Sequence, residues 1–130
     1  MKTETRWIAD HHFEGEHEGN VFSMDGEKKV GPSPKALLLT GLAGCSGIDV
    51  VDILEKMKVP FSDFTITAET EQTEDHPKVF KEITVVYTLK SERSNEVKIR
   101  KAIDLSLEKY CGVAAMLKKN SPISYRLVIQ

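Results

Sequence analysis

The sequence predicts a single α+β domain that spans residues 1–130. Two observations point to this class. Segments in which apolar and polar residues alternate, as in half-buried strands, flank two longer stretches with helical spacing. The length of 130 residues fits one domain, and the 40% apolar content fits a globular chain with its own core. No segment is repeated and none is of low complexity.

Three short strands are expected at the beginning of the chain. Small or apolar residues alternate with charged ones from Thr3 to Ala9, and two further short segments follow, one at Phe13 and one over residues 21–24. The dipeptide Asp25-Gly26 then predicts a turn.

A long central helix is expected next. Ser33 is suited to the N-cap, and Pro34 to the first helical position, where its missing N–H is no loss. Residues 36–48 are apolar or small on every side, which predicts a helix that is buried all round. From Asp49 the pattern becomes amphipathic, and it stops before Pro60.

A hairpin, a second helix and a last strand complete the chain. Alternation predicts strands over 64–71, 83–89 and 123–129. The second helix should begin at a cap formed by Ser94 or Asn95. Its apolar stripe recurs at four-residue spacing through Ile99, Ile103, Leu107 and Cys111.

Charge and composition exclude several classes of function. The chain has 18 basic and 20 acidic residues, so it lacks the basic excess that nucleic-acid binding needs. The first residues carry charge where a signal peptide is apolar, and no apolar run approaches about 20 residues, so a membrane span is not expected. The cytoplasm is the expected location, and in that reducing compartment the two cysteines should not form a lasting structural disulfide.

Cys45 lies among three glycines of the predicted central helix. Gly41, Gly44 and Gly47 leave a strip without side chains, although each glycine costs about 1 kcal/mol relative to alanine inside a helix. The pattern indicates close approach of a second helix or of a substrate to Cys45. Tight helix packing around a buried, inert thiol explains it as well. Asp49, one turn further on, would oppose a thiolate at Cys45 if it stayed unpaired.

Cys111 is predicted on the apolar stripe of the second helix. Two inward-facing thiols on two core helices could meet, and two independent core cysteines fit the pattern equally well.

The segment from His11 to Glu18 is rich in histidine and glutamate. On a strand, however, its side chains alternate between two faces, which splits the potential ligands, so no metal site is expected. The glycine-rich stretch lies in a helix and fits no phosphate-binding loop, and no GxSxG or HExxH motif is present.

Two segments make the chain resemble the OsmC/Ohr family: Gly31-Pro32-Ser33-Pro34 leading through Leu37-Leu38-Leu39 to Gly44-Cys45, and Asp104-Leu105-Ser106 through Lys109-Tyr110-Cys111. The resemblance covers nearly the whole chain. It implies an α+β, OsmC-like subunit of order βββ-α-ββ-αα-β that forms an intertwined (swapped) homodimer with two central helices.

The resemblance also implies a dithiol peroxidase that reduces organic hydroperoxides in oxidative-stress defence. Cys45 would attack the peroxide and become a sulfenic acid, and Cys111 would resolve it to a Cys45–Cys111 disulfide. An external dithiol, of lipoyl type in some members, would reopen that disulfide. No bound cofactor and no metal are implied.

The chain departs from the family pattern at two positions. Characterised peroxidases of the family carry a glutamate just after the helix-opening proline, whereas Lys35 and Ala36 follow Pro34 here. Their early arginine has no equivalent between Trp7 and Glu27, which leaves Arg6 as the candidate that supports a Cys45 thiolate, with partial charge available from His11, His12 or His17. Two alternatives follow: a non-catalytic dimer that binds a small apolar ligand, and a redox sensor.

Overall fold

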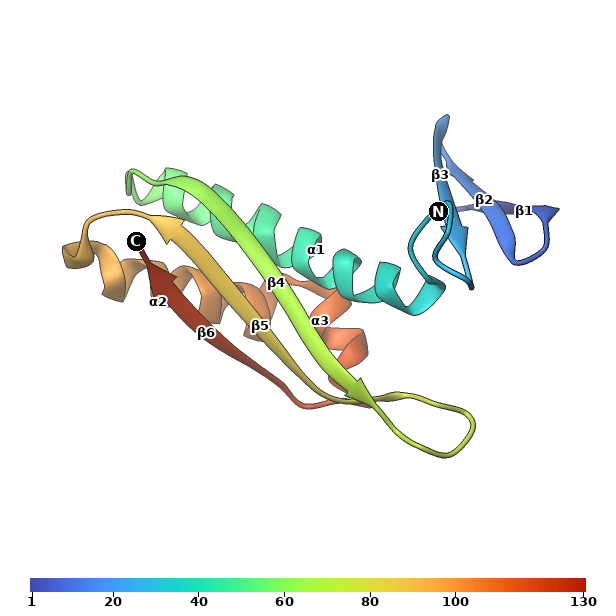
Figure 1. Cartoon of the computed structure of the whole chain (residues 1–130). Helices are drawn as coiled ribbons and strands as arrows, with labels where there is room; N and C mark the ends of the chain where they lie inside the picture. The colour runs from blue at the N-terminus through green and yellow to red at the C-terminus, as the bar shows by residue number, and fades with distance from the viewer. The chain divides into compact units, whose positions relative to one another are not determined.

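The computed structural model describes residues 1–130, which form two compact units, residues 1–39 and residues 40–130. Each unit contains one three-stranded sheet, in agreement with the predicted α+β class (Figure 1). Whether the two units form a single domain, as the sequence predicts, stays a prediction.

The strands are β1 (Glu4–Ala9), β2 (His12–His17), β3 (Asn20–Asp25), β4 (Ser62–Gln72), β5 (Phe80–Lys90) and β6 (Ile123–Ile129). The helical segments are α1 (Pro34–Lys56), η1 (Arg93–Asn95), α2 (Glu96–Leu105), η2 (Ser106–Tyr110) and α3 (Gly112–Leu117).

The first unit contains the three strands that the alternation predicted, and they form an antiparallel sheet in the order β1-β2-β3. Its register places Trp7 opposite Phe13, and Gly15 opposite Phe22, so the aromatic side chains share one face. A Cβ atom on Gly15 would lie 2.5 Å from the ring of Phe22, which explains the glycine there. The aromatic face is uncovered, because Trp7 remains 62% exposed and Phe22 41%.

The predicted turn after β3 is held by the side chain of Asp25. Its carboxylate accepts the backbone N–H of Glu27 at 2.8 Å, that of Lys29 at 3.2 Å and that of Val30 at 3.3 Å. These hydrogen bonds, that of Glu27 first, hold the pKa of Asp25 below its usual value, because they stabilise the charged form.

The long helix α1 begins at Pro34, as predicted, and ends at Lys56. Its buried side recurs every four residues and consists of Leu42, Ser46, Val50 and Leu54. The prediction that the helix is buried all round is wrong for this chain, because Ile48 is 66% exposed and a Cβ on Gly41 or Gly44 would meet no atom within 4 Å. Within its unit the helix packs on one side only.

By length and composition, α1 is the one helix that could cross a membrane: the mean hydropathy of its most apolar 18 residues is 1.7. The prediction that no apolar run reaches this length is therefore wrong. The core helix of a water-soluble protein passes the same test. The hydrogen bonds that Ser46 and Asp49 of α1 make to Ser106 show that this side of the helix packs against protein.

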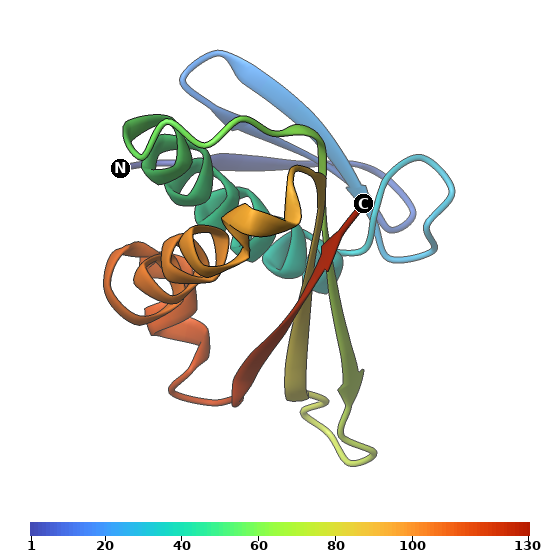
Figure 2. The same ribbon diagram turned by 90° about the vertical axis from the view of Figure 1, so that its left-hand side faces the viewer.

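The second unit contains the sheet β4-β5-β6. Strand β5 pairs antiparallel with β4 and parallel with β6, so the chain must cross over between β5 and β6. This crossover carries α2, η2 and α3, and the helices of the unit lie together on one face of the sheet (Figures 1 and 2). The inward side chains of β5 form the core and are fully buried: Ile83, Val85, Tyr87 and Leu89.

The second helix is shorter than predicted. Regular α-helix ends at Leu105, and the next five residues form a wider π-turn in which the N–H of Cys111 donates to the carbonyl of Ser106 at 2.8 Å. Cys111 itself has extended backbone angles, φ −74° and ψ 104°. The prediction that Cys111 lies within the helix is therefore wrong, because the wide turn interrupts the four-residue spacing. Asn95 occupies the predicted cap position without a capping side-chain bond.

Candidate functional site

The two cysteines of the second unit are both free and interact with each other. Cys45 is half-buried on α1, and Cys111 is 3% exposed at the start of α3. The Cys45 thiol is among the groups that raise the pKa of the Cys111 thiol, which places the two groups near each other. Of the two arrangements that the sequence allowed, the structure favours the one in which the thiols meet.

The surroundings of Cys111 keep its thiol neutral. Burial raises its pKa to about 11, and both Cys45 and Asp49 act in the same direction. The N–H of Ala114, which donates to the Cys111 Sγ at 3.3 Å, acts in the opposite direction but is the weaker influence. A buried thiol that stays protonated at neutral pH is a poor first nucleophile, and Cys45 is the less buried of the two cysteines.

A chain of buried hydroxyl groups lies beside the cysteines. The Tyr87 hydroxyl is 2.6 Å from Ser46 Oγ, which is 2.8 Å from Ser106 Oγ, and this last atom is 2.9 Å from Asp49 Oδ2. Tyr87, Ser46 and Ser106 have no exposed surface, and burial raises the pKa of Tyr87 to about 12. These hydrogen bonds therefore connect strand β5, helix α1 and the π-turn before Cys111.

Sequence reasoning missed most of this chain and anticipated only Asp49. A usable signal was present, since Ser46 and Ser106 occupy core-facing positions among apolar residues of their helices. Buried hydroxyls are almost always hydrogen-bonded, so two such serines imply polar partners within the core.

An apolar groove of about 510 Å³ runs along α1 on the side of β4. Gly44 and Gly47 lie on either side of Cys45 in the sequence and both line the groove, but Cys45 does not. The groove therefore lies on a face of α1 next to the one that carries Cys45. The lining residues are Thr40, Ala43, Gly44, Gly47, Ile48, Val51, Asp52, Phe64 and Ile66.

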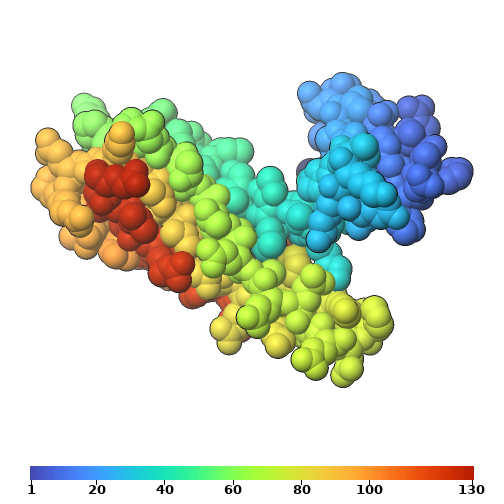
Figure 3. Space-filling model, viewed as in Figure 1, coloured from blue at the N-terminus to red at the C-terminus, as the bar shows by residue number.

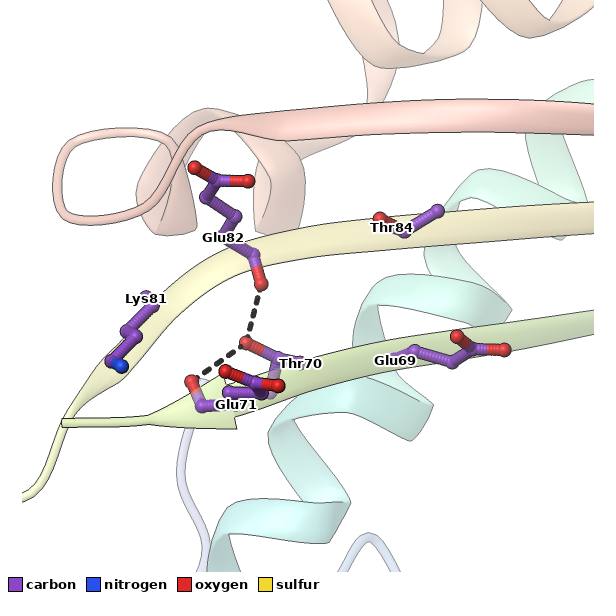
Figure 4. A pocket seen from close by; sticks show the side chains of 6 residues that line it. All are labelled: Glu69, Thr70, Glu71, Lys81, Glu82 and Thr84. Atoms are coloured by element: carbon purple, nitrogen blue, oxygen red, sulfur yellow. Dashed lines mark hydrogen bonds between the residues drawn. The ribbon is translucent and has the colours of Figure 1, made fainter. Parts of the chain in front are cut away.

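A second hollow, of about 480 Å³, is polar and lies where β4 and β5 approach the tip of their hairpin, the yellow-green end of the chain in Figure 3. Figure 4 shows the side chains that line it. The hydroxyl of Thr70 donates to the backbone carbonyl of Glu82 at 2.6 Å, so its hydrogen bond is made within the two strands. Of the other side chains that line the hollow, four are charged and exposed, and the fifth is the small side chain of Thr84. Neither cysteine lines this hollow. Its lining residues are Glu69, Thr70, Glu71, Lys81, Glu82 and Thr84.

Arg6 and the three histidines at positions 11, 12 and 17 belong to the first unit. The guanidinium of Arg6 pairs with Glu14 across β1 and β2, with Nη2 at 3.0 Å from Oε1. The prediction that Arg6 supports a thiolate at Cys45 stays a prediction. His12 Nε2 contacts Ser23 Oγ at 3.3 Å, and His17 Nδ1 contacts the carbonyl of Lys2 at 2.8 Å. No group of three or more His, Cys, Asp or Glu side chains in the chain has the arrangement of a metal site.

Comparison with known proteins identifies relatives over nearly the full length. The family model described as OsmC-like protein matches residues 25–126. Protein YhfA of Escherichia coli (strain K12) is 35% identical over 132 residues, which cover 98% of each chain.

Solved structures share the fold. The OsmC-like protein from Mycoplasma pneumoniae has a TM-score of 0.86 at 16% identity, covering 98% of this chain and 95% of that one. An organic hydroperoxide resistance protein OsmC from Legionella pneumophila has a TM-score of 0.68 at 16% identity, over the same shares of the two chains. The family match, the near-complete relative and the shared α+β architecture agree, and this chain belongs to the OsmC family.

Proposed function

We propose that the protein is a dithiol peroxidase that reduces organic hydroperoxides. The observation that carries the proposal is a half-buried Cys45 thiol that lies near enough to the buried Cys111 thiol to raise its pKa. The Legionella relative is named as an organic hydroperoxide resistance protein, and this name supports the substrate class.

The reaction has two steps at the cysteines. The Cys45 thiolate attacks the O–O bond of the hydroperoxide, its sulfur takes one oxygen to become a sulfenic acid, and the other oxygen leaves with a proton as the alcohol. The sulfur of Cys111 then attacks the sulfenic sulfur, and the hydroxyl group leaves as water, taking up the proton of the Cys111 thiol. The product is a Cys45–Cys111 disulfide.

An external dithiol completes the cycle. It reduces the disulfide by two exchange steps, leaves as its own cyclic disulfide and restores both thiols. A lipoyl-type dithiol is one such reductant, and no bound cofactor or metal takes part. Because the cycle begins from reduced thiols, we place the protein in the reducing environment of the cytoplasm, in oxidative-stress defence, without a nucleic-acid or membrane partner.

The apolar groove along α1 favours a hydroperoxide with an apolar substituent. Its residues Ile48, Phe64 and Ile66 offer an apolar surface on the helix that carries Cys45. The same groove is the observation that favours the alternative, a family member that binds a small apolar ligand without turnover.

Mass spectrometry of the reduced protein tests the proposal directly. After one equivalent of an organic hydroperoxide, we expect the mass to fall by two hydrogens and a Cys45–Cys111 peptide link to appear, faster than with hydrogen peroxide. An unchanged mass would contradict the peroxidase proposal and favour ligand binding in the groove. A disulfide that forms once, without multiple turnover in the presence of a dithiol, would favour a redox sensor.

We propose further that the protein is a homodimer in which the chains are intertwined around their two central helices. Two apolar surfaces of the single chain support this proposal: the aromatic face of the first sheet around Trp7 and the exposed side of α1 at Ile48. Monomeric proteins rarely leave apolar surfaces of this kind open to water. The open space beside Gly41 and Gly44 would let a second helix approach α1 closely.

Substitution of Ile48 by lysine should weaken the dimer. We expect light scattering coupled to size exclusion to give the wild type twice the chain mass of 14.6 kDa, and Ile48→Lys to move toward the single-chain mass at low concentration. Val97→Lys is the matched control, because Val97 is 80% exposed on α2. A wild-type mass of one chain at every concentration would contradict the dimer.

A further inference from the structure

The turn that carries Cys111 is tied to α1 by the side chain of one buried residue, Ser106. Three oxygen atoms of α1 lie around the Ser106 Oγ atom: Ser46 Oγ at 2.8 Å, Asp49 Oδ2 at 2.9 Å and the Ser46 carbonyl at 3.4 Å. Ser106 has no exposed surface, and neither has Ser46. The two serines are 60 positions apart in the chain, so their contact holds the helix and the turn in one relative position.

The same residue also holds Cys111 through the backbone. The carbonyl of Ser106 accepts the N–H of Cys111 at 2.8 Å across the π-turn. Ser46 follows Cys45 directly in the sequence. The path between the two cysteines therefore consists of one peptide bond, the contact between the two serine hydroxyls and the hydrogen bond across the turn. Both hydrogen bonds of this path join buried residues.

The two serines are not needed to fill the core, since alanine is of nearly the same size. A buried hydroxyl costs free energy unless it is hydrogen-bonded, so the serines favour the arrangement of α1 and the turn in which both are paired. A pair of thiols needs such a fixed arrangement, because a disulfide forms only when the two Cα atoms lie about 4.4–6.8 Å apart. Single π-turns are also frequent at functional sites.

We propose that Ser46 and Ser106 are positioning residues for the second step of the reaction: the contact between their hydroxyls holds the Cys111 turn against the helix of Cys45 and thereby sets the rate at which the disulfide closes. The proposal rests on the proposed dithiol function and deepens it. The serines act through the backbone of Cys111 and not on the peroxide. They reduce the conformational freedom that Cys111 must lose to reach Cys45, so the first step should not depend on them.

Exchange with an aromatic disulfide separates the two steps without any peroxide. The Cys45 thiolate attacks dithiobis(nitrobenzoate), which releases one coloured thiolate and leaves a mixed disulfide on Cys45. Cys111 then loses its proton and attacks the Cys45 sulfur, which releases the second coloured thiolate and closes the Cys45–Cys111 disulfide. The second release does not depend on the concentration of the reagent, so its rate measures how well Cys111 is placed.

Ser106→Ala should slow the second release about tenfold and leave the first release at the wild-type rate. The reduction potential of the disulfide should rise by about 30 mV, the equivalent of a tenfold change, when the protein is equilibrated with dithiothreitol buffers. A general loss of stability would not move this potential, because it affects the reduced and the oxidised protein alike.

Ser46→Ala tests the same contact from the side of α1 and changes nothing in the Cys111 turn. It removes one of the three contacts around the Ser106 hydroxyl, so we expect the second release to slow by about threefold. The double variant should be no slower than Ser106→Ala, because both substitutions remove the same contact.

Ser121→Ala is the matched control. Ser121 is also a buried serine of the second unit, 1% exposed, and its hydroxyl donates to the carbonyl of Phe80 at 2.9 Å. It lies neither on the helix of Cys45 nor in the turn before Cys111. This variant loses a buried hydrogen bond of the same kind and should match the wild type in both releases and in the reduction potential.

Three results would overturn the positioning role and leave the dithiol function in place. The first is a second release in Ser106→Ala at the wild-type rate. The second is an equal slowing in Ser121→Ala, which would mean that any loosening of the core delays closure. The third is a double variant in which the two single effects multiply, which would mean that the serines act separately. If the wild type shows no second release, the dithiol function fails, and the positioning role fails with it.

Discussion

Replacing Cys45 by serine should abolish the reduction of organic hydroperoxides. The serine hydroxyl is close in size to the thiol but does not form a sulfenic acid, so we expect at least a hundredfold loss of turnover, of the order seen when an essential nucleophile is removed. The measurement is peroxide consumption in the presence of an excess of dithiol.

Cys111→Ser provides the matched comparison for Cys45→Ser. This variant keeps the attacking thiol and loses the resolving one, so a single equivalent of hydroperoxide should leave Cys45 one oxygen heavier and reactive toward a sulfenic-acid trap. Equal peroxide consumption by wild type and Cys45→Ser would exclude the proposed chemistry, whatever Cys111→Ser does.

Truncation of Tyr87 should give the largest loss of stability among the variants considered. Its side chain is fully buried at the centre of β5 and packs near Phe64 and Tyr125, with ring centroids 6.4 Å and 6.0 Å away. Tyr87→Ala should lower the free energy of unfolding by about 3–5 kcal/mol, as for other buried aromatic side chains. Urea unfolding at one fixed protein concentration measures the loss, because a dimer is stabilised by concentration.

Tyr87→Phe isolates the hydroxyl group. It keeps the ring and removes only the donor to Ser46, so we expect a loss of about 1–2 kcal/mol. Tyr110→Phe is the control, since Tyr110 is 54% exposed and its substitution should change the free energy of unfolding by less than about 0.5 kcal/mol. Equal effects of Tyr87→Phe and Tyr87→Ala would contradict the packing role of the ring.

Much of the fold could be predicted from local patterns. The alternation of Ile83, Val85, Tyr87 and Leu89 is the signature of a strand with one buried face, and these four side chains are fully buried. Pro34 marked the beginning of α1 correctly, because its fixed φ and missing N–H suit that position alone within a helix. Features of this kind depend on a few neighbouring residues.

The parts that could not be predicted depend on distant segments. Nothing in residues 123–129 reveals that β6 pairs parallel with β5, since alternation is the same for either direction. The contact of Ser46 with Ser106 joins residues 60 positions apart. The apolar character of α1 on every side predicts that the helix is buried but not what buries it, and its face at Ile48 is exposed in the single chain.

The π-turn before Cys111 has a consequence for how a pair of thiols is built between helices. In an unbroken helix, a cysteine at four-residue spacing would stay in line with Ile103 and Leu107, as one more core side chain. The N–H of Cys111 reaches back five residues instead of four, so backbone length, rather than the type of side chain, sets where the sulfur points. One inserted or deleted residue in such a turn would point the sulfur of Cys111 in another direction without altering either cysteine, so protein engineers could use the length of the turn to aim a side chain.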